Sequence, residues 1–189
     1  MSTSTTNPVI DRPQAANLAL NGGSKTAEPN VGMIAVKLTE EEIEAAVGVM
    51  RSGMLAAGKH VLEFEEKFAK MTGAKHAMAC ANGTCALQLA YGVTIEPGDE
   101  VLCPSWTYVA TASMLVAAGA KIVWVDADPA TYTIDVEDLR KKVTQNTAAI
   151  ACTHIYGNPV NIAAVESLAA EHGLSVIYDA AQSHMATYD

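Results

Sequence analysis

The sequence has few positive charges and no long hydrophobic run. Lys and Arg number 12 against 21 Asp and Glu, which leaves a formal net charge of −9. An acidic chain without a basic block is poorly suited to binding nucleic acid or an anionic membrane surface. The best candidate for a membrane helix, residues 109–120, is shorter than the roughly 20 residues required and is interrupted by Thr111 and Ser113. The composition therefore predicts neither a nucleic-acid-binding nor a membrane protein.

Cysteine pairs with the spacing of zinc ligands are also missing. The four cysteines, Cys80, Cys85, Cys103 and Cys152, form neither a CxxC pair nor a Cys/His cluster, so no metal site is expected. A chain of 189 residues, half of them apolar, buries a sizeable core without disulfide bonds. We therefore expect free, buried thiols and a cytoplasmic protein. Residues 1–14 lack the apolar stretch of a secretory signal, in agreement with this expectation.

The pattern along the chain predicts an arm followed by one domain. Residues 1–37 have little hydrophobic periodicity and contain a Gly-Gly pair and three prolines, which predicts a partly disordered N-terminal arm. From Thr39 the pattern becomes helical, because Thr39 and Glu42 have the spacing of a capping box and apolar residues follow at helical intervals. Residues 38–189 are therefore expected to form one large domain.

Within this domain, short apolar runs alternate with helical segments. Asn82, Asp135 and Asn161 are expected to cap three of the helices. Strands separated by helices of roughly 10–15 residues indicate crossover connections and a mainly parallel sheet. The apolar strands indicate that both faces of the sheet are covered. The predicted fold is α/β, with three layers and helices on both faces of the sheet. Strands are expected over residues 76–79, 100–103, 121–125, 147–153 and 175–178.

Ligands of parallel sheets bind beyond the carboxyl ends of the strands, so the strand-to-helix turns are the candidate sites. In the first turn, Gly83 allows close approach to a ligand, the free N–H groups at the helix start attract an anion, and the Thr84 hydroxyl adds a hydrogen bond. The alternative is that Asn82 simply caps the helix, which explains the same turn sequence without a ligand. The turn matches neither the GxxxxGK loop nor the GxGxxG turn of nucleotide-binding proteins.

Two later turns carry an aromatic ring and a carboxylate. Trp106 follows a strand directly, where its ring stacks on a planar ligand or packs in the core. Asp179 ends the last strand, and a buried carboxylate at that position needs a partner. It pairs with a cationic heteroaromatic nitrogen of a ligand, caps a helix, or forms a salt bridge. From their positions alone, Gln182 and His184 are interpreted as surface residues. The other histidines are interpreted as packing or surface residues.

Taken together, the three turns fit a single ligand. An anion cradle, a stacking ring and a deep carboxylate suit a small, flat, phosphorylated molecule with a cationic ring. Pyridoxal 5'-phosphate has this chemistry, and enzymes that use it pair an acid with the ring nitrogen. The sequence therefore predicts pyridoxal 5'-phosphate as the cofactor.

Six segments reinforce this prediction: 81–84 (ANGT), 96–101 (EPGDEV), 104–112 (PSWTYVATA), 125–128 (VDAD), 154–159 (HIYGNP) and 179–182 (DAAQ). Their sequences, order and spacing resemble those of the DegT/StrS-type sugar aminotransferases, over residues 36 to 188. The resemblance implies a fold-type I enzyme, usually a homodimer, whose large cofactor-binding domain is present in truncated form. It also implies transfer of an amino group from an amino acid, often glutamate or glutamine, to a keto sugar, with or without a linked nucleotide, or to a cyclitol.

Site roles follow from the matching motifs. The resemblance implies that Gly83 and Thr84 hold the cofactor phosphate and that Trp106 stacks on the cofactor ring. It implies further that Asp179 pairs with the ring nitrogen, and that Gln182 contacts the hydroxyl side of the ring.

One departure from the family concerns the lysine that forms a Schiff base with the cofactor. In the family it follows the DAAQ segment in a Ser-x-x-Lys context, whereas the nine lysines of this sequence all lie at or before Lys142. We also expect the small C-terminal domain of the family to be missing, and we therefore expect the chain alone not to transaminate. Two other interpretations stay open: a sugar dehydratase of the same fold, which uses His in place of Lys, and a non-catalytic fragment that binds a cofactor or a partner.

Overall fold

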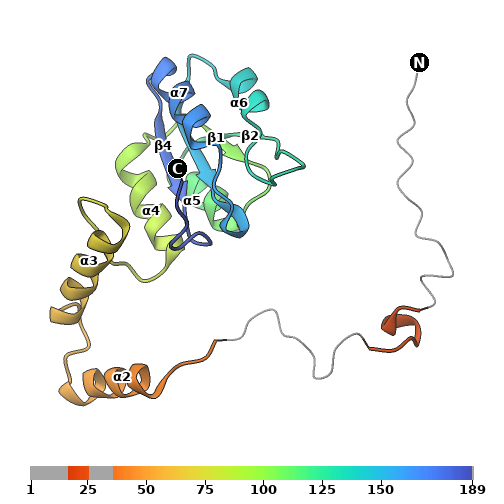
Figure 1. Cartoon of the computed structure of the whole chain (residues 1–189). Helices are drawn as coiled ribbons and strands as arrows, with labels where there is room; N and C mark the ends of the chain where they lie inside the picture. Colours follow the sequence, from red (N-terminus) through yellow and green to blue (C-terminus); the bar gives the residue numbers. More distant parts are fainter. Residues whose placement is uncertain (1–16, 26–35, 189) are drawn as a thin grey trace. The chain divides into compact units, whose positions relative to one another are not determined.

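The computed structural model describes residues 17–25 and 36–188 (Figure 1). The chain divides into two units, Met1–Ala56 and Ala57–Asp189. Most of the predicted arm lies outside the described residues, and a division between residues 37 and 38 stays a prediction.

Helix α2 (Glu40–Ser52), in the first unit, begins as the sequence predicts. The Glu42 N–H donates to the Thr39 hydroxyl at 3.3 Å, and the Thr39 N–H donates to Glu42 Oε2 at 2.6 Å, which completes the capping box. The N–H group and the hydroxyl of Thr39 both donate to Glu42 Oε2, which lowers the pKa of the Glu42 carboxyl. The helix ends at Gly53, whose φ of 73° is one that glycine adopts without strain. The 3-10 helix η1 (Ala19–Asn21) also belongs to this unit.

A four-stranded sheet forms the centre of the second unit. All of its neighbouring strands are parallel, in the order β2-β1-β3-β4, and helices make the crossover connections between consecutive strands. The predicted parallel α/β fold is therefore confirmed. The strands are β1 (Glu100–Pro104), β2 (Lys121–Val125), β3 (Thr147–Thr153) and β4 (Ser175–Asp179).

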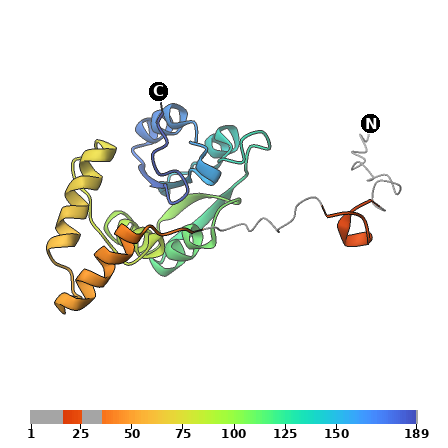
Figure 2. The same cartoon turned by 60° about the horizontal axis from the view of Figure 1, so that its bottom comes forward.

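Helices cover both faces of this sheet, as predicted (Figure 2). Alternate residues of β1 point to opposite faces: Val101 and Cys103 pack against α4 and α5, whereas Leu102 packs with α6 and α7. The unit therefore has three layers and two hydrophobic cores. Among the described residues, no helix is long and apolar enough to span a bilayer. The covering helices are α4 (Gly83–Thr94), α5 (Val109–Ala117), α6 (Val136–Lys142) and α7 (Ile162–His172).

Side-chain caps fix where three of these helices begin. Asn82, Asp135 and Asn161 are the N-cap residues of α4, α6 and α7, as the sequence predicts. The cap Asn82 therefore also fixes the turn at the start of α4, in which ligand contacts are expected. The side-chain oxygens of the three caps accept the N–H groups of Cys85, Glu137 and Ala164 at 2.9, 2.8 and 3.1 Å.

The predicted strand over residues 76–79 is wrong. In the structure this segment is irregular and leads from α3 (Lys59–Thr72) to α4. The Ala79 N–H donates to Glu65 Oε1 of α3 at 2.8 Å instead of to a neighbouring strand. A short apolar run becomes a strand only where another strand accepts its hydrogen bonds, and within the described sheet none lies beside this segment.

All four cysteines are free thiols, as expected. Cys103 and Cys152 are buried, and burial raises the pKa of the Cys103 thiol to about 12 and that of Cys152 further still. Cys80 is exposed and Cys85 is half-buried, so the expectation that every thiol is buried is wrong. The reason is their position, because both lie at the turn into α4 and outside the two cores.

Candidate functional site

A buried carboxylate marks the carboxyl end of the sheet. Asp179, the last residue of β4, is 9% exposed. Its Oδ2 accepts the Thr111 hydroxyl at 2.8 Å, and its Oδ1 accepts the Ala181 N–H at 3.2 Å. Within residues 17–25 and 36–188 no cationic side chain forms an ion pair with it, so the alternative of a buried salt bridge is not realised there. The carboxylate is held in place by neutral donors and can receive a cationic partner.

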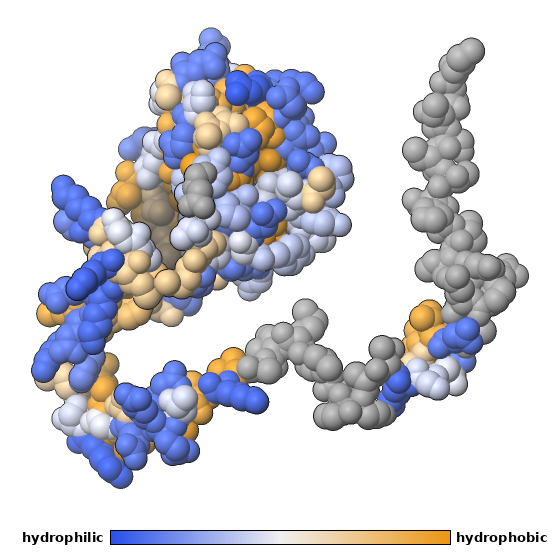
Figure 3. Space-filling model, viewed as in Figure 1, coloured by the Kyte–Doolittle hydropathy of each residue, from blue (hydrophilic) through white to orange (hydrophobic). Residues whose placement is uncertain are grey.

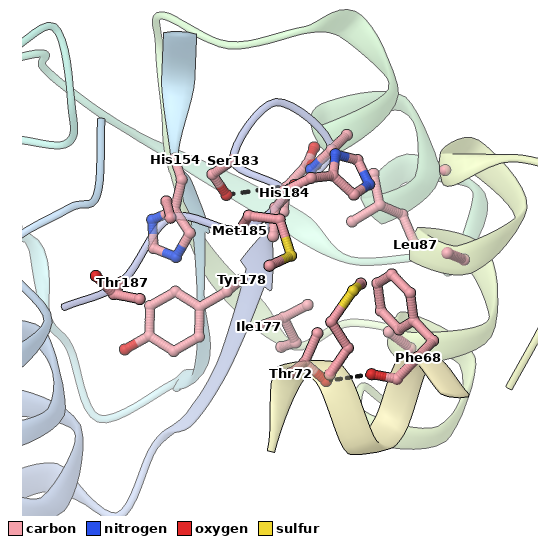
Figure 4. A pocket seen from close by; sticks show the side chains of 18 residues that line it. Phe68, Thr72, Leu87, His154, Ile177, Tyr178, Ser183, His184, Met185 and Thr187 are labelled. Carbon is pink, nitrogen blue, oxygen red and sulfur yellow. Dashed lines mark hydrogen bonds between the residues drawn. The ribbon is translucent and has the colours of Figure 1, made fainter. Parts of the chain in front are cut away.

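A cavity of about 680 Å³ opens beside Asp179. Helices α3 and α4, strand β4 and the segment 180–187 form its walls, and Figure 3 shows the hollow bordered by apolar residues. In Figure 4, Phe68 and Thr72 approach from α3, while His154 and Tyr178 lie on another side. Neither Lys nor Arg is found among the described residues that line it. Its volume suits a small organic molecule, with few charged groups to orient it.

The N-terminus of α4 reaches this cavity through Gly83. In the described part of the chain, the N–H groups of Gly83 and Thr84 meet no protein acceptor, because Asn82 Oδ1 accepts the Cys85 N–H instead. Asn82 is thus a cap, and two donors remain at the positive end of the helix. A Cβ on Gly83 would lie 3.8 Å from the Ala181 Cβ, so the turns after Asn82 and Asp179 are close neighbours. Thr84 is half-buried and is not among the lining residues.

Trp106 lies in a second hollow, of about 330 Å³, at the ends of β1 and β2. Its ring centroid is 6.5 Å from that of Tyr132, and Asp126 and Asp128 also line this hollow. Because Trp106 is 50% exposed, its interpretation as a core aromatic is wrong. The structure does not bring the Trp106 ring to the cavity beside Asp179. Stacking of Trp106 on the cofactor stays a prediction.

Gln182 joins two of the strand-to-helix turns. Its Oε1 accepts the Tyr156 N–H at 2.6 Å. Tyr156 has a φ of 56°, which is unusual for a residue other than glycine, so this hydrogen bond supports a strained turn after β3. Gln182 does not line the cavity in the described structure, although its neighbours Ala181 and Ser183 do. Contact between Gln182 and the cofactor also stays a prediction.

His154 is a site residue that sequence reasoning missed. It follows β3 directly, lines the cavity, and stacks on Tyr178 with ring centroids 5.2 Å apart. Its Nδ1 accepts the Val160 N–H at 3.2 Å, so the neutral ring carries its proton on Nε2. Burial lowers the pKa of His154, and the charge of Asp179 offsets part of this effect. The ring is therefore a neutral donor beside the carboxylate. Its position after a strand, like that of Asp179, was the available signal.

The lowered pKa of His154 predicts a pH-dependent stability. The unfolded chain has the ordinary histidine pKa of about 6.5, so it binds a proton at a higher pH than the folded chain does. The folded state therefore loses stability as the pH falls through about 6.5. His154→Gln is expected to lose less free energy of unfolding than the unaltered chain between pH about 7.5 and about 5.5, measured by urea unfolding. His60→Gln, at a side chain 74% exposed, is the control and should follow the unaltered chain. Equal pH dependence in all three chains would contradict the prediction.

Curated proteins of sugar metabolism are similar to this chain. UDP-2-acetamido-2-deoxy-3-oxo-D-glucuronate aminotransferase of Pseudomonas aeruginosa is 42% identical over 151 residues, which cover 79% of this chain and 42% of that protein. GDP-perosamine synthase of Caulobacter vibrioides is 40% identical over 162 residues, which cover 85% of this chain and 44% of that protein. The chain thus spans less than half the length of these two relatives.

Solved structures share its fold. An aminotransferase from Psychrobacter cryohalolentis superposes with a TM-score of 0.77 at 37% identity, over 80% of this chain and 39% of that one. A GDP-4-keto-6-deoxymannose-3-dehydratase, solved with a trapped PLP-glutamate geminal diamine, superposes with a TM-score of 0.80 at 28% identity, over 85% of this chain and 43% of that one. The three-layer fold is therefore that of pyridoxal-phosphate enzymes.

The sequence match covers the whole described part of the second unit. Residues 36–189 match the DegT/DnrJ/EryC1/StrS aminotransferase family, and this range contains the sheet, the cavity beside Asp179 and every predicted site residue. Composition, fold and sequence similarity thus agree, and the chain belongs to the DegT/DnrJ/EryC1/StrS aminotransferase family.

Proposed function

We propose that this chain forms the cofactor-binding part of a pyridoxal-phosphate-dependent aminotransferase. The observation that carries the proposal is the buried Asp179 carboxylate, which lines the same cavity as Gly83 at the N-terminus of α4. A pyridinium nitrogen needs an acidic partner, and a phosphate needs N–H donors, and these two groups meet both needs. When bound, pyridoxal phosphate supplies a protonated ring that withdraws electrons from the carbon bearing the amino group.

The residues of the candidate site have defined tasks in this proposal. Asp179 pairs with the ring nitrogen and keeps it protonated. The N–H groups of Gly83 and Thr84 bind the phosphate, because no Lys or Arg lines the described cavity and a helix N-terminus supplies both donors and a favourable dipole. Gln182 contacts the hydroxyl side of the ring, and His154 offers its Nε2 proton as a hydrogen-bond donor. The largely apolar walls of the cavity pack against the flat faces of the ring.

The proposed substrates come from the chemistry of the relatives. The amino donor is an amino acid, glutamate or glutamine, and the acceptor is a keto sugar, with or without a linked nucleotide, or a cyclitol. The proposed setting is the cytoplasm, where free thiols such as the four of this chain persist, and the proposed assembly of the whole enzyme is a homodimer. A sugar dehydratase is the second candidate, because a dehydratase superposes on this chain with a TM-score of 0.80.

Binding of a cofactor analogue tests the proposal directly. Pyridoxine 5'-phosphate is the probe, because its alcohol cannot react with surface lysines as the aldehyde of the cofactor does. Equilibrium dialysis with the 189-residue chain should show saturable binding at one site, and pyridoxine without the phosphate should bind about tenfold more weakly. Equal affinities would contradict the phosphate site at α4, and no saturable binding would contradict the cofactor-binding proposal as a whole.

Tryptophan fluorescence tests the predicted stacking of Trp106. The chain has two tryptophans, so Trp106→Phe leaves Trp124 as the only one, and Trp124→Phe leaves Trp106. If Trp106 stacks on the cofactor, pyridoxal 5'-phosphate should quench most of the fluorescence of the Trp124→Phe chain and little of that of the Trp106→Phe chain. Equal quenching in the two variants would contradict stacking and would leave Trp106 in its hollow with Tyr132.

A further inference from the structure

Three threonine hydroxyls form a chain of hydrogen bonds that ends on Asp179. Thr153 Oγ1 lies 2.7 Å from Thr107 Oγ1, which lies 2.9 Å from Thr111 Oγ1, which donates to Asp179 Oδ2 at 2.8 Å. Thr153 ends β3, Thr107 lies in the turn after β1, and Thr111 is in the first turn of α5. This row of hydroxyls therefore joins three separate elements to the end of β4.

The direction of each hydrogen bond in this row of hydroxyls follows from the carboxylate at which the row ends. The carboxylate only accepts, so the single hydroxyl hydrogen of Thr111 is directed to Asp179 Oδ2. Thr111 must then accept from Thr107, whose own hydrogen is thereby used. Thr107 in turn accepts from Thr153. One orientation of the three hydroxyls satisfies all the bonds, and such aligned bonds strengthen one another.

Burial fixes these groups in place. Thr111, Thr153 and Asp179 are all buried. Thr111 is β-branched, so its χ1 is restricted, and the Tyr91 hydroxyl donates to its backbone carbonyl at 3.1 Å. Burial raises the pKa of Tyr91, so that this hydroxyl stays a donor. The Thr111 hydroxyl has no freedom to turn away from the carboxylate without leaving Oδ2 unsatisfied.

We propose that Thr111 is the positioning residue of Asp179, and that Thr153 and Thr107 direct its hydroxyl hydrogen onto Oδ2 so that the carboxylate faces the cavity in one orientation. The consequence for the cofactor rests on the proposed function: a carboxylate held by Thr111 and by the Ala181 N–H presents its remaining lone pairs to a ring nitrogen without reorganising first. Thr107 and Thr111 lie within the segment 104–112, but the sequence alone gave neither of them a role at the site.

Two substitutions separate the hydroxyl from the packing of Thr111. Thr111→Val keeps the branched shape and removes the donor, whereas Thr111→Ser keeps the donor. Thr111→Val is expected to bind pyridoxine 5'-phosphate about tenfold more weakly and Thr111→Ser within about threefold of the unaltered chain. Thr94→Val is the matched control, because the half-buried Thr94 hydroxyl only bonds to the Ala90 carbonyl of its own helix, and its affinity should not change.

A measurement without cofactor makes the test independent of the proposed function. The carbon-13 signal of the Asp179 carboxyl group, assigned by its loss in Asp179→Asn, should shift in Thr111→Val and stay in place in Thr111→Ser and Thr94→Val. An unchanged signal in Thr111→Val, or an equal shift in Thr111→Ser, overturns the positioning role. If the unaltered chain binds no probe while the signal still shifts in Thr111→Val, the proposed function fails and the positioning role stands.

Discussion

Replacing Asp179 with asparagine is expected to weaken the binding of pyridoxine 5'-phosphate by about 10- to 100-fold. The amide has the shape of the carboxylate but no charge, so the charge-assisted hydrogen bond to the ring nitrogen is lost. Hydrogen bonds to charged groups contribute about 1.5–3 kcal/mol, which corresponds to this range of affinity. Because Asp179 is buried, water screens the interaction little. Equilibrium dialysis at neutral pH measures the two dissociation constants.

A second carboxylate provides the control for this substitution. Asp126 follows β2 at the same end of the sheet, but it is exposed and lines the hollow of Trp106. Asp126→Asn removes the same charge from the chain and should leave the affinity unchanged. Equal losses in the two variants would show that the effect comes from net charge, and an unaltered affinity in Asp179→Asn would show that the ring nitrogen is not paired with Asp179.

Local patterns account for most of what the sequence predicted about the fold. Capping residues such as Asn82 and Asp135 act on N–H groups two or three positions away, so they can be read from a short window. The apolar runs of β1 and β3, the central strands, reflect burial on both faces of the sheet and indicate parallel pairing. The wrong prediction of a strand at residues 76–79 has the opposite cause, because it depends on a distant part of the sequence. A strand forms only beside another strand, and a short window does not show whether one is there.

The candidate site was predictable where one residue ends a strand. Asp179 was found because it terminates an apolar run, and the same argument applied to His154 would have found it too. The hydroxyl chain could not be found in this way. Thr107 and Thr153 are 46 positions apart, and Thr111 and Asp179 are 68 apart, so only the folded sheet brings them together. The position of Trp106, in a hollow with Tyr132, likewise depends on a loop that follows another strand.

Leu115→Ala is expected to destabilise the second unit by about 2–5 kcal/mol. Leu115 lies on the buried side of α5, in the core formed with α4 and the sheet, and has no exposed surface. Truncation to alanine removes buried apolar surface and leaves a cavity that the surrounding side chains fill only in part. For a chain of this size, the loss corresponds to a fall in melting temperature of between about 4 and 20 °C. Urea unfolding followed by far-UV circular dichroism measures the change in free energy.

The neighbouring residue of the same helix is the matched control. Val116 is 65% exposed, and Val116→Ala has no cavity to create, so its effect should stay within about 0.5 kcal/mol. Since Leu115 lies one helical turn after Thr111, the cavity loosens the support of the hydroxyl that holds Asp179. Leu115→Ala should therefore also weaken binding of pyridoxine 5'-phosphate under conditions where the variant is folded. Destabilisation without any loss of affinity would show that α5 holds Thr111 in position independently of its packing on the sheet.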